Sequence, residues 1–296
     1  MDFGRLLTAM VTPFDQHGEV DYQQTKHLID HLIAHKTETL VVNGTTGESP
    51  TLTSEEKSKF IQFVVEYVNG RIPVIAGTGS NNTLESIQLT KESTAIGVDG
   101  VMVVTPYYNK PNQEGMYQHF KAIAASTHLP VMLYNIPGRS VVRLDVDTII
   151  RLSQIENITS IKDATGDLEA VSTINERTKD DFKVYSGDDP MTLPILSVGG
   201  YGVVSVTSHI AGEAMHQLID DYVNGHARDA IKTERELSSL MKALFIAPNP
   251  VPVKQALNLL GYTVGSVRLP LVPLNDVEFN IVKEAVDVYL ENRKIS

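Results

Sequence analysis

Ile158-Thr159-Ser160-Ile161-Lys162-Asp163-Ala164-Thr165 is a short, β-branched run that places a lysine directly after its apolar residues. Such a run predicts a buried strand, and lysine is rarely buried without a partner because removing an ammonium group from water is costly. Lys162 is therefore either a catalytic amine that acts as a nucleophile or a strand-end side chain whose charged tip reaches solvent. The other strands of the chain bear on that choice.

Short β-branched or aliphatic runs alternate along the whole chain with longer segments of helical periodicity, which is typical of parallel strands joined by crossover helices. The expected strands are 6–12, 39–43, 73–77, 100–105, 131–135, 159–163, 183–186 and 202–207. The expected helices include 21–35, 54–68, 83–96, 113–127 and 215–224. Thr53 and Glu56 form a predicted capping box before the second of these. Eight strand–helix units predict an α/β fold, the (β/α)8 TIM barrel.

The strand pattern stops after about residue 224, and the remaining segments have helical periodicity. Helices are expected at 227–245, 251–260 and 276–293, separated by proline-bearing breaks at 247–250 and 269–273. The sequence therefore predicts a catalytic barrel over residues 1–224 and a C-terminal helical domain over residues 225–296.

Composition excludes several classes of function. The chain has 296 residues, 42% of them hydrophobic, and no run approaches the roughly 18 apolar residues of a membrane helix. A signal peptide is not evident, and the absence of cysteine excludes disulfides and thiolate metal sites, so we expect a cytoplasmic protein. The net charge of -11 disfavours nucleic-acid binding. We expect small-molecule substrates and neither a nucleic-acid nor a membrane partner.

Polar side chains follow the expected strands at the point where each strand ends, which is where a TIM barrel has its active site. They are Thr45 and Thr46, Tyr107 and Tyr108, Tyr134 and Arg139, Lys162, Ser186 to Asp189, and Thr207 to His209. Each has an ordinary explanation when taken alone, since glycine, serine and threonine make turns and tyrosines line rims. Their shared structural position favours a common site.

A buried Lys162 could act as a catalytic nucleophile, because burial favours the neutral amine. A neutral amine can attack a carbonyl group and form a Schiff base. The iminium promotes loss of an adjacent proton and gives an enamine, which is a carbon nucleophile. Tyr134, Thr45 and Tyr108 are candidates to relay protons. The loop of Thr45 and Thr46 has neutral hydrogen-bond donors for the carboxylate of a keto acid. The planar guanidinium group of Arg139 can bind a second carboxylate through two parallel hydrogen bonds.

These residues resemble the dihydrodipicolinate synthase (4-hydroxy-tetrahydrodipicolinate synthase) family over nearly the whole chain. The matching motifs are Gly44-Thr45-Thr46-Gly47-Glu48-Ser49, Thr105-Pro106-Tyr107-Tyr108-Asn109, Tyr134-Asn135-Ile136-Pro137-Gly138-Arg139, Ile161-Lys162-Asp163-Ala164-Thr165, Asn249-Pro250-Val251-Pro252-Val253-Lys254 and Arg268-Leu269-Pro270-Leu271. Each motif alone is weak evidence, whereas their ordered spacing is specific.

The resemblance implies that Lys162 binds pyruvate as a Schiff base and that the enamine adds to L-aspartate 4-semialdehyde, in diaminopimelate and lysine biosynthesis. It implies a proton relay of Thr45, Tyr134 and Tyr108, with Tyr108 entering the site of a neighbouring subunit in a homodimer or homotetramer. Arg139 would receive the semialdehyde's carboxylate. The remaining substrate-binding positions implied are Thr46, Gly187 and Val204.

The chain departs from the family pattern at two places. Lysine-inhibited members often have histidines where this chain has Ser54 and Lys57, so we expect weak or absent inhibition by lysine. Other positions still match the family's allosteric lysine site, namely Ser49, Asn81, Glu85 and Tyr107. His209 stands where the family commonly has asparagine; we expect a tolerated substitution at the rim of the site, or a residue that tunes its electrostatics.

Two rival functions stay open. One is another pyruvate-dependent aldolase, such as N-acetylneuraminate lyase, which has a similar tyrosine and lysine but typically Ser-Thr in its glycine loop. The other is a barrel that binds keto acids without catalysis. No cofactor and no metal are expected: His27, His31 and His35 fit a solvated helix face, and Asp188 and Asp189 a solvated acidic pair. The loop at 77–82 lacks a complete dinucleotide fingerprint.

Overall fold

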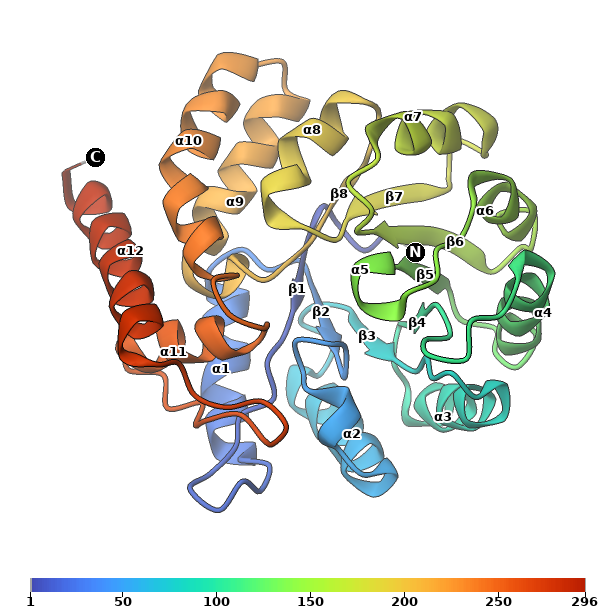
Figure 1. The fold of residues 1–296 in the computed structure, drawn as a ribbon, viewed down its shortest axis with the longest axis horizontal. Coiled ribbons are helices and arrows are strands. Elements are labelled where there is room, and N and C mark those ends of the chain that lie inside the picture. The colour runs from blue at the N-terminus through green and yellow to red at the C-terminus, as the bar shows by residue number, and fades with distance from the viewer. Residues whose placement is uncertain (1, 296) are drawn as a thin grey trace.

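The predicted barrel is confirmed. The computed structural model describes residues 2–295, with side chains described as far as residue 292. Within this range parallel strands pair in chain order, and the last strand returns to the first to close the barrel (Figure 1). The strands are β1 (Leu6–Ala9), β2 (Thr39–Val42), β3 (Val74–Gly77), β4 (Gly100–Val104), β5 (Val131–Asn135), β6 (Ile158–Asp163), β7 (Lys183–Ser186) and β8 (Gly202–Ser205).

Helices surround the strands and cover their outer side (Figure 1). They are α1 (Tyr22–Ala34), α2 (Ser54–Val68), α3 (Thr83–Ile96), α4 (Gln113–Ala124), α6 (Val146–Leu152), α7 (Leu168–Arg177), α8 (Thr192–Ser197) and α9 (Ser208–Val223). Single turns lie in the loops at η1 (Ser49–Thr51), α5 (Pro137–Ser140) and η2 (Asp189–Met191). The predicted capping box of α2 is confirmed, because Thr53 Oγ1 accepts the Glu56 N–H and the Glu56 carboxylate accepts the Thr53 N–H.

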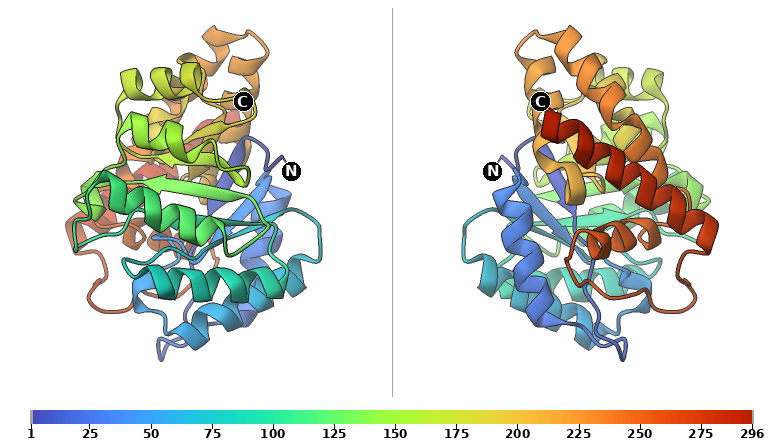
Figure 2. Two further views of the ribbon diagram at one scale, coloured as in Figure 1. Left: turned by 90° about the vertical axis from the view of Figure 1, so that its right-hand side faces the viewer. Right: turned by 90° about the vertical axis from the view of Figure 1, so that its left-hand side faces the viewer.

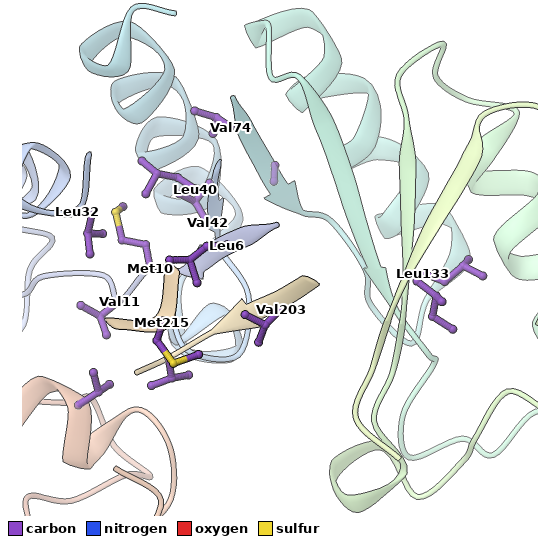
Figure 3. Close-up of a cluster of buried hydrophobic side chains, with 14 of the residues drawn as sticks. Leu6, Met10, Val11, Leu32, Leu40, Val42, Val74, Leu133, Val203 and Met215 are labelled. Atoms are coloured by element: carbon purple, nitrogen blue, oxygen red, sulfur yellow. The ribbon is translucent and has the colours of Figure 1, made fainter. Parts of the chain in front are cut away.

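Alternation along the strands divides the core into two layers, since successive side chains point to opposite faces. The layer inside the barrel includes Leu7, Val41, Met102, Tyr134 and Val204. The layer between strands and helices is larger; Figure 3 shows part of it. The side chains labelled there are Leu6, Met10, Val11, Leu32, Leu40, Val42, Val74, Leu133, Val203 and Met215. The barrel is thus a filled core and not an open pore.

Strands β1, β2, β4 and β8 end earlier than the sequence predicted, and α9 begins earlier. After β8 the backbone leaves the sheet because Asp189 Oδ2 accepts the N–H groups of Val206 and Thr207, at 3.0 and 2.9 Å, and the Thr207 hydroxyl. Helix α9 then starts at Ser208, with an irregular residue at Ala211 that interrupts its periodicity. Asp189 is buried, so the expectation of a solvated acidic pair is wrong for this residue.

Two expectations about histidines are also wrong. His31 is buried rather than solvated, and its Nε2–H donates to the carbonyl oxygen of His209 at 2.8 Å. His209 lies inside the protein rather than at the rim of the site: its Nδ1 donates to the Val206 carbonyl, and its Nε2 accepts the Val11 N–H. Across residues 2–292, no three His, Cys, Asp or Glu side chains gather as a set that could hold a metal ion.

The C-terminal helices are confirmed as α10 (Ala227–Ala243), α11 (Val251–Leu259) and α12 (Asp276–Ile295). α10 packs against α9, and α12 packs against α10 and α11. In the right-hand view of Figure 2, α12 runs diagonally across the front of the molecule. None of the helices in the described range has both the length and the apolar character that a membrane crossing requires. The division into domains at residue 224 stays a prediction.

Candidate active site

Lys162 lies on the inner side of the barrel, where the register of β5 and β6 pairs it with Tyr134. Its side chain is 5% exposed, and its Nζ lies 4.3 Å from the centre of the Tyr134 ring. Lys254, which is also buried, is paired with Glu48 at 2.6 Å, whereas no carboxylate pairs with Lys162 in the described part of the chain. The Lys162 amine is thus buried without an ion-pair partner among the described residues.

Gly187 provides the space that the Lys162 side chain occupies. A Cβ at Gly187 would come within 3.2 Å of Lys162 Cε and 2.8 Å of Ala164 Cβ, so a larger residue would collide with the lysine or its neighbour. The Gly187 N–H donates to the Asp163 carbonyl at 2.7 Å, which fixes this backbone beside β6. Val204 lies in the inner core layer with Tyr134. Gly187 therefore lies beside Lys162, and Val204 lies in the core layer that contains Tyr134.

A cavity of about 650 Å³ opens at the carboxyl ends of the strands. Its lining includes Thr45, Tyr134, Tyr108 and Arg139, so the structure brings these predicted residues to one space. Lys162, Thr46, Gly187 and Val204 do not line this cavity and lie in the buried interior, apart from Gly187, which is partly exposed. Four residues match the family's allosteric lysine site. Three of them, Ser49, Glu85 and Tyr107, line the same cavity, whereas Asn81 does not.

The predicted relay is not assembled by hydrogen bonds. Within the described residues, no hydrogen bond joins the hydroxyl groups of Thr45, Tyr134 and Tyr108. Tyr108 is 86% exposed and has a φ of 73°, a backbone conformation that non-glycine residues rarely adopt. Its phenol therefore extends from a strained loop toward solvent at the edge of the cavity.

Thr46 is held from the far end of the sequence. The side-chain Nδ2 of Asn249 donates to Thr46 Oγ1 at 2.9 Å, and both side chains are buried. Sequence reasoning assigned no role to Asn249, although its motif was part of the family resemblance. The two residues are 203 positions apart, so no local pattern could have joined them.

Charges near the site are tuned mainly by burial. Burial raises the pKa of the Asp163 carboxyl next to Lys162, although hydrogen bonds from Thr165 and Asn135 oppose the shift. Farther out in the cavity, burial lowers the pKa of Lys57, and the nearby Glu85 carboxylate opposes that change. The cavity is thus lined by the guanidinium group of Arg139 and the amine of Lys57.

Comparison with known proteins identifies the family. The family model described as "Dihydrodipicolinate synthetase family" matches residues 2–288. The chain belongs to this family. The 4-hydroxy-tetrahydrodipicolinate synthase of Bacillus subtilis is 62% identical over 279 residues, covering 94% of this chain and 96% of that relative. The chain is thus an enzyme, and the prediction that its activity is that of a 4-hydroxy-tetrahydrodipicolinate synthase is confirmed.

Solved structures agree with this membership. A dihydrodipicolinate synthase from Bacillus anthracis is 56% identical, with a TM-score of 0.95 and coverage of 97% of this chain and 98% of that one. The chloride-inhibited dihydrodipicolinate synthase from Acinetobacter baumannii, solved in complex with pyruvate, is 40% identical, with a TM-score of 0.94 and coverage of 97% and 99%. Both likenesses extend over the barrel and the C-terminal helices.

Proposed function

We propose that the enzyme holds pyruvate as a Schiff base on Lys162 and condenses it with L-aspartate 4-semialdehyde, in diaminopimelate and lysine biosynthesis in the cytoplasm. The observation that carries this proposal is the unpaired, buried amine of Lys162 beside the Tyr134 ring, in a family whose relatives are named for this synthase activity. The relative crystallised with pyruvate supports the first substrate.

The chemistry follows from the amine. Neutral Lys162 attacks the keto carbon of pyruvate, and after proton transfers to the oxygen a water molecule leaves, which gives the iminium. The iminium withdraws electrons, so a methyl proton is lost and an enamine forms. The enamine carbon attacks the aldehyde carbon of the second substrate and forms a carbon–carbon bond, while a proton is delivered to the new alkoxide. Hydroxyl groups of Tyr134, Thr45 and Tyr108 carry these protons in this proposal.

Two carboxylates need separate binding groups. Thr46 would donate to the carboxylate of pyruvate, and the bond from Asn249 supports this because the Thr46 oxygen is already an acceptor and its own hydrogen remains to be donated. Arg139, which lines the cavity, would receive the carboxylate of the semialdehyde through its guanidinium fork. The backbones of Gly187 and Val204 would confine the bound pyruvate near Lys162.

Trapping the covalent intermediate tests this proposal. Incubation with pyruvate and borohydride should add a reduced adduct to Lys162 alone, as read by peptide mass spectrometry. Lys162→Ala should lose the adduct and turnover while keeping the fold, as checked by circular dichroism. A wild-type protein that binds pyruvate without forming any adduct would overturn the Schiff-base step. Substantial turnover in the variant would identify another nucleophile.

The second substrate needs its own test, because another aldolase would also form the adduct. In the absence of borohydride, the enzyme should consume pyruvate when aspartate semialdehyde is present and not when N-acetylmannosamine is present. A preference for the sugar would overturn the assignment of the second substrate and leave the Schiff-base step intact.

We also propose a homodimer or homotetramer in which Tyr108 of one subunit enters the site of its neighbour. Support comes from the exposed Tyr108 phenol and from Leu84 and Val141, which are also exposed. Mixing inactive Lys162→Ala subunits with weakly active Tyr108→Phe subunits tests it, since a hybrid would contain one site with both groups intact. Activity above that of either parent is expected, and its absence despite subunit exchange would rule out action between subunits.

A further inference from the structure

The side chain of Asn135 joins the two ends of the segment 136–143, which contains Arg139. It is the last residue of β5, directly after Tyr134, and its side chain is 1% exposed. Its Oδ1 accepts the Leu144 N–H at 3.0 Å, and its Nδ2 donates to the Leu144 carbonyl at 3.2 Å. This pair of bonds ties both ends of residues 136–143 together.

The same side chain faces the strand of the proposed nucleophile. Asn135 Nδ2 lies 3.4 Å from Asp163 Oδ2, and the Asn135 carbonyl accepts the Ala164 N–H at 2.9 Å. Asp163 directly follows Lys162, and its Oδ1 accepts both the N–H and the hydroxyl of Thr165. Asn135 therefore joins three parts of the site: the strand of Tyr134, the strand of Lys162 and the segment of Arg139.

Arg139 depends on this segment for its position. It lies on α5, a helix of four residues, and its side chain is exposed rather than packed in the core. The turn is completed by bonds from the Ser140 hydroxyl to the carbonyls of Ile136 and Val142. These bonds are internal to the segment, so they shape the turn without fixing it to the barrel. The buried bonds of Asn135 connect it to the barrel core. Exposed bonds of Arg143, with Gln113 and Asp167, add a connection at the surface.

We propose that Asn135 is a positioning residue that sets Arg139 at the correct distance from the pyruvate enamine on Lys162. The inference rests on the proposed function and assigns a role to a residue that the function left unused. Because all partners of the Asn135 amide are buried, losing it leaves polar groups unsatisfied and lets the segment relax. A displacement of about 1 Å in a substrate-positioning group can cost as much as 10²-fold in rate.

The experiment separates the two substrates. Asn135→Ala should raise KM for aspartate semialdehyde by about tenfold, with less than about a twofold change in KM for pyruvate and normal adduct formation on Lys162. Asn157→Ala is the matched control: its amide also holds backbone carbonyls, of Ala124, Thr127 and Leu129, but just before β6, at the end of the barrel opposite the site. The control should leave both KM values unchanged.

A double variant tests whether Asn135 acts through Arg139. If it does, Asn135→Ala should change the semialdehyde kinetics by less than about twofold in an Arg139→Ala background, because the group being positioned is gone. The inference would be overturned if the fold-changes of the two single substitutions multiplied in the double variant. It would also be overturned if Asn135→Ala raised the KM values for both substrates equally. Either result would indicate a general structural role.

Two further measurements distinguish a failure of the inference from misfolding of the variant and from a failure of the proposed function. Should Asn135→Ala fail to fold, Asn135→Ser keeps a hydrogen-bonding group at this position without adding a second carboxylate beside Asp163. It should give a smaller rise in KM of the same selectivity. Adduct formation in the wild type reports on the proposed function separately. A wild type without the adduct refutes the function, whereas a normal adduct with multiplying effects refutes only the role of Asn135.

Discussion

Lys254 Nζ and Glu48 Oε1 form an ion pair of 2.6 Å in which the two side chains are 2% and 1% exposed. Lys254 belongs to α11 in the C-terminal region, and Glu48 follows the paired threonines after β2. The other carboxylate oxygen of Glu48 accepts the Arg268 N–H at 2.9 Å, and Lys254 also donates to the Ser266 carbonyl. The C-terminal helices therefore fasten the loop that carries Thr45 and Thr46.

We predict that Lys254→Ala strongly destabilises the protein. Removing one partner of a buried ion pair leaves the other charge uncompensated, which costs about 3–5 kcal/mol of unfolding free energy. Urea unfolding measures this loss. Lys232→Ala is the control, because Lys232 and Glu236 form an exposed pair at 3.9 Å whose loss should change stability by less than about 1 kcal/mol. Equal effects of the two substitutions would contradict the prediction.

We predict that His209 makes the protein sensitive to acid. Burial lowers the pKa of His209 from 6.5 to about 4, and His31 opposes its protonation too. Between these values the unfolded chain holds the extra proton, so stability rises with pH and falls as the pH is lowered from 6.5 toward 4, by up to about 3 kcal/mol. Burial also lowers the pKa of His31, which adds a loss in the same direction.

His209→Asn should make the stability depend less on pH over this range. The measurement is urea unfolding at a series of pH values, compared as slopes because the variant also loses hydrogen bonds. His27→Asn, at an exposed position, is the matched control. A slope that His209→Asn leaves unchanged would show that other groups cause the acid sensitivity.

We predict that Gly187→Ala impairs Schiff-base formation. The added methyl group would meet Ala164 Cβ at 2.8 Å, which forces a local shift, and Lys162 Cε at 3.2 Å, so the lysine must also give way by a few tenths of an ångström. Stability should fall by about 1–3 kcal/mol, and the rate of adduct formation with pyruvate by about tenfold or more. Gly138→Ala is the control, since no atom lies within 4 Å of a Cβ there. Unchanged trapping in the Gly187 variant would refute this steric account.

We predict weak or absent inhibition by L-lysine. Ser54 and Lys57 line the cavity together with Ser49, Glu85 and Tyr107, so the amine of Lys57 competes with the amine of any ligand for Glu85. Replacing both Ser54 and Lys57 with histidine should increase inhibition in steady-state assays. Lys59→Ala, which removes an exposed partner of Glu55, should leave it unchanged. Strong inhibition of the unmodified enzyme would show that these two positions do not determine the response.

Local patterns were enough to predict the barrel and much of the candidate site. Short β-branched or aliphatic runs and segments of helical periodicity reflect which residues are buried. A parallel barrel brings every strand's carboxyl end to the same side. That rule placed Thr45, Tyr134, Tyr108 and Arg139 around one cavity, as the structure has them. The proton relay itself stays a prediction, because no hydrogen bond joins its hydroxyls in the described residues.

The sequence by itself determined the strand order, the lysine on β6 and the family. Only the tertiary structure decided how polar side chains between and beyond the strands are used. His209, His31 and Asp189 are buried, and each makes a hydrogen bond to a residue of another segment. Thr46 with Asn249, and Glu48 with Lys254, are pairs separated by more than 200 residues. Periodicity reports burial within one element, whereas such pairs form only when the chain closes on itself.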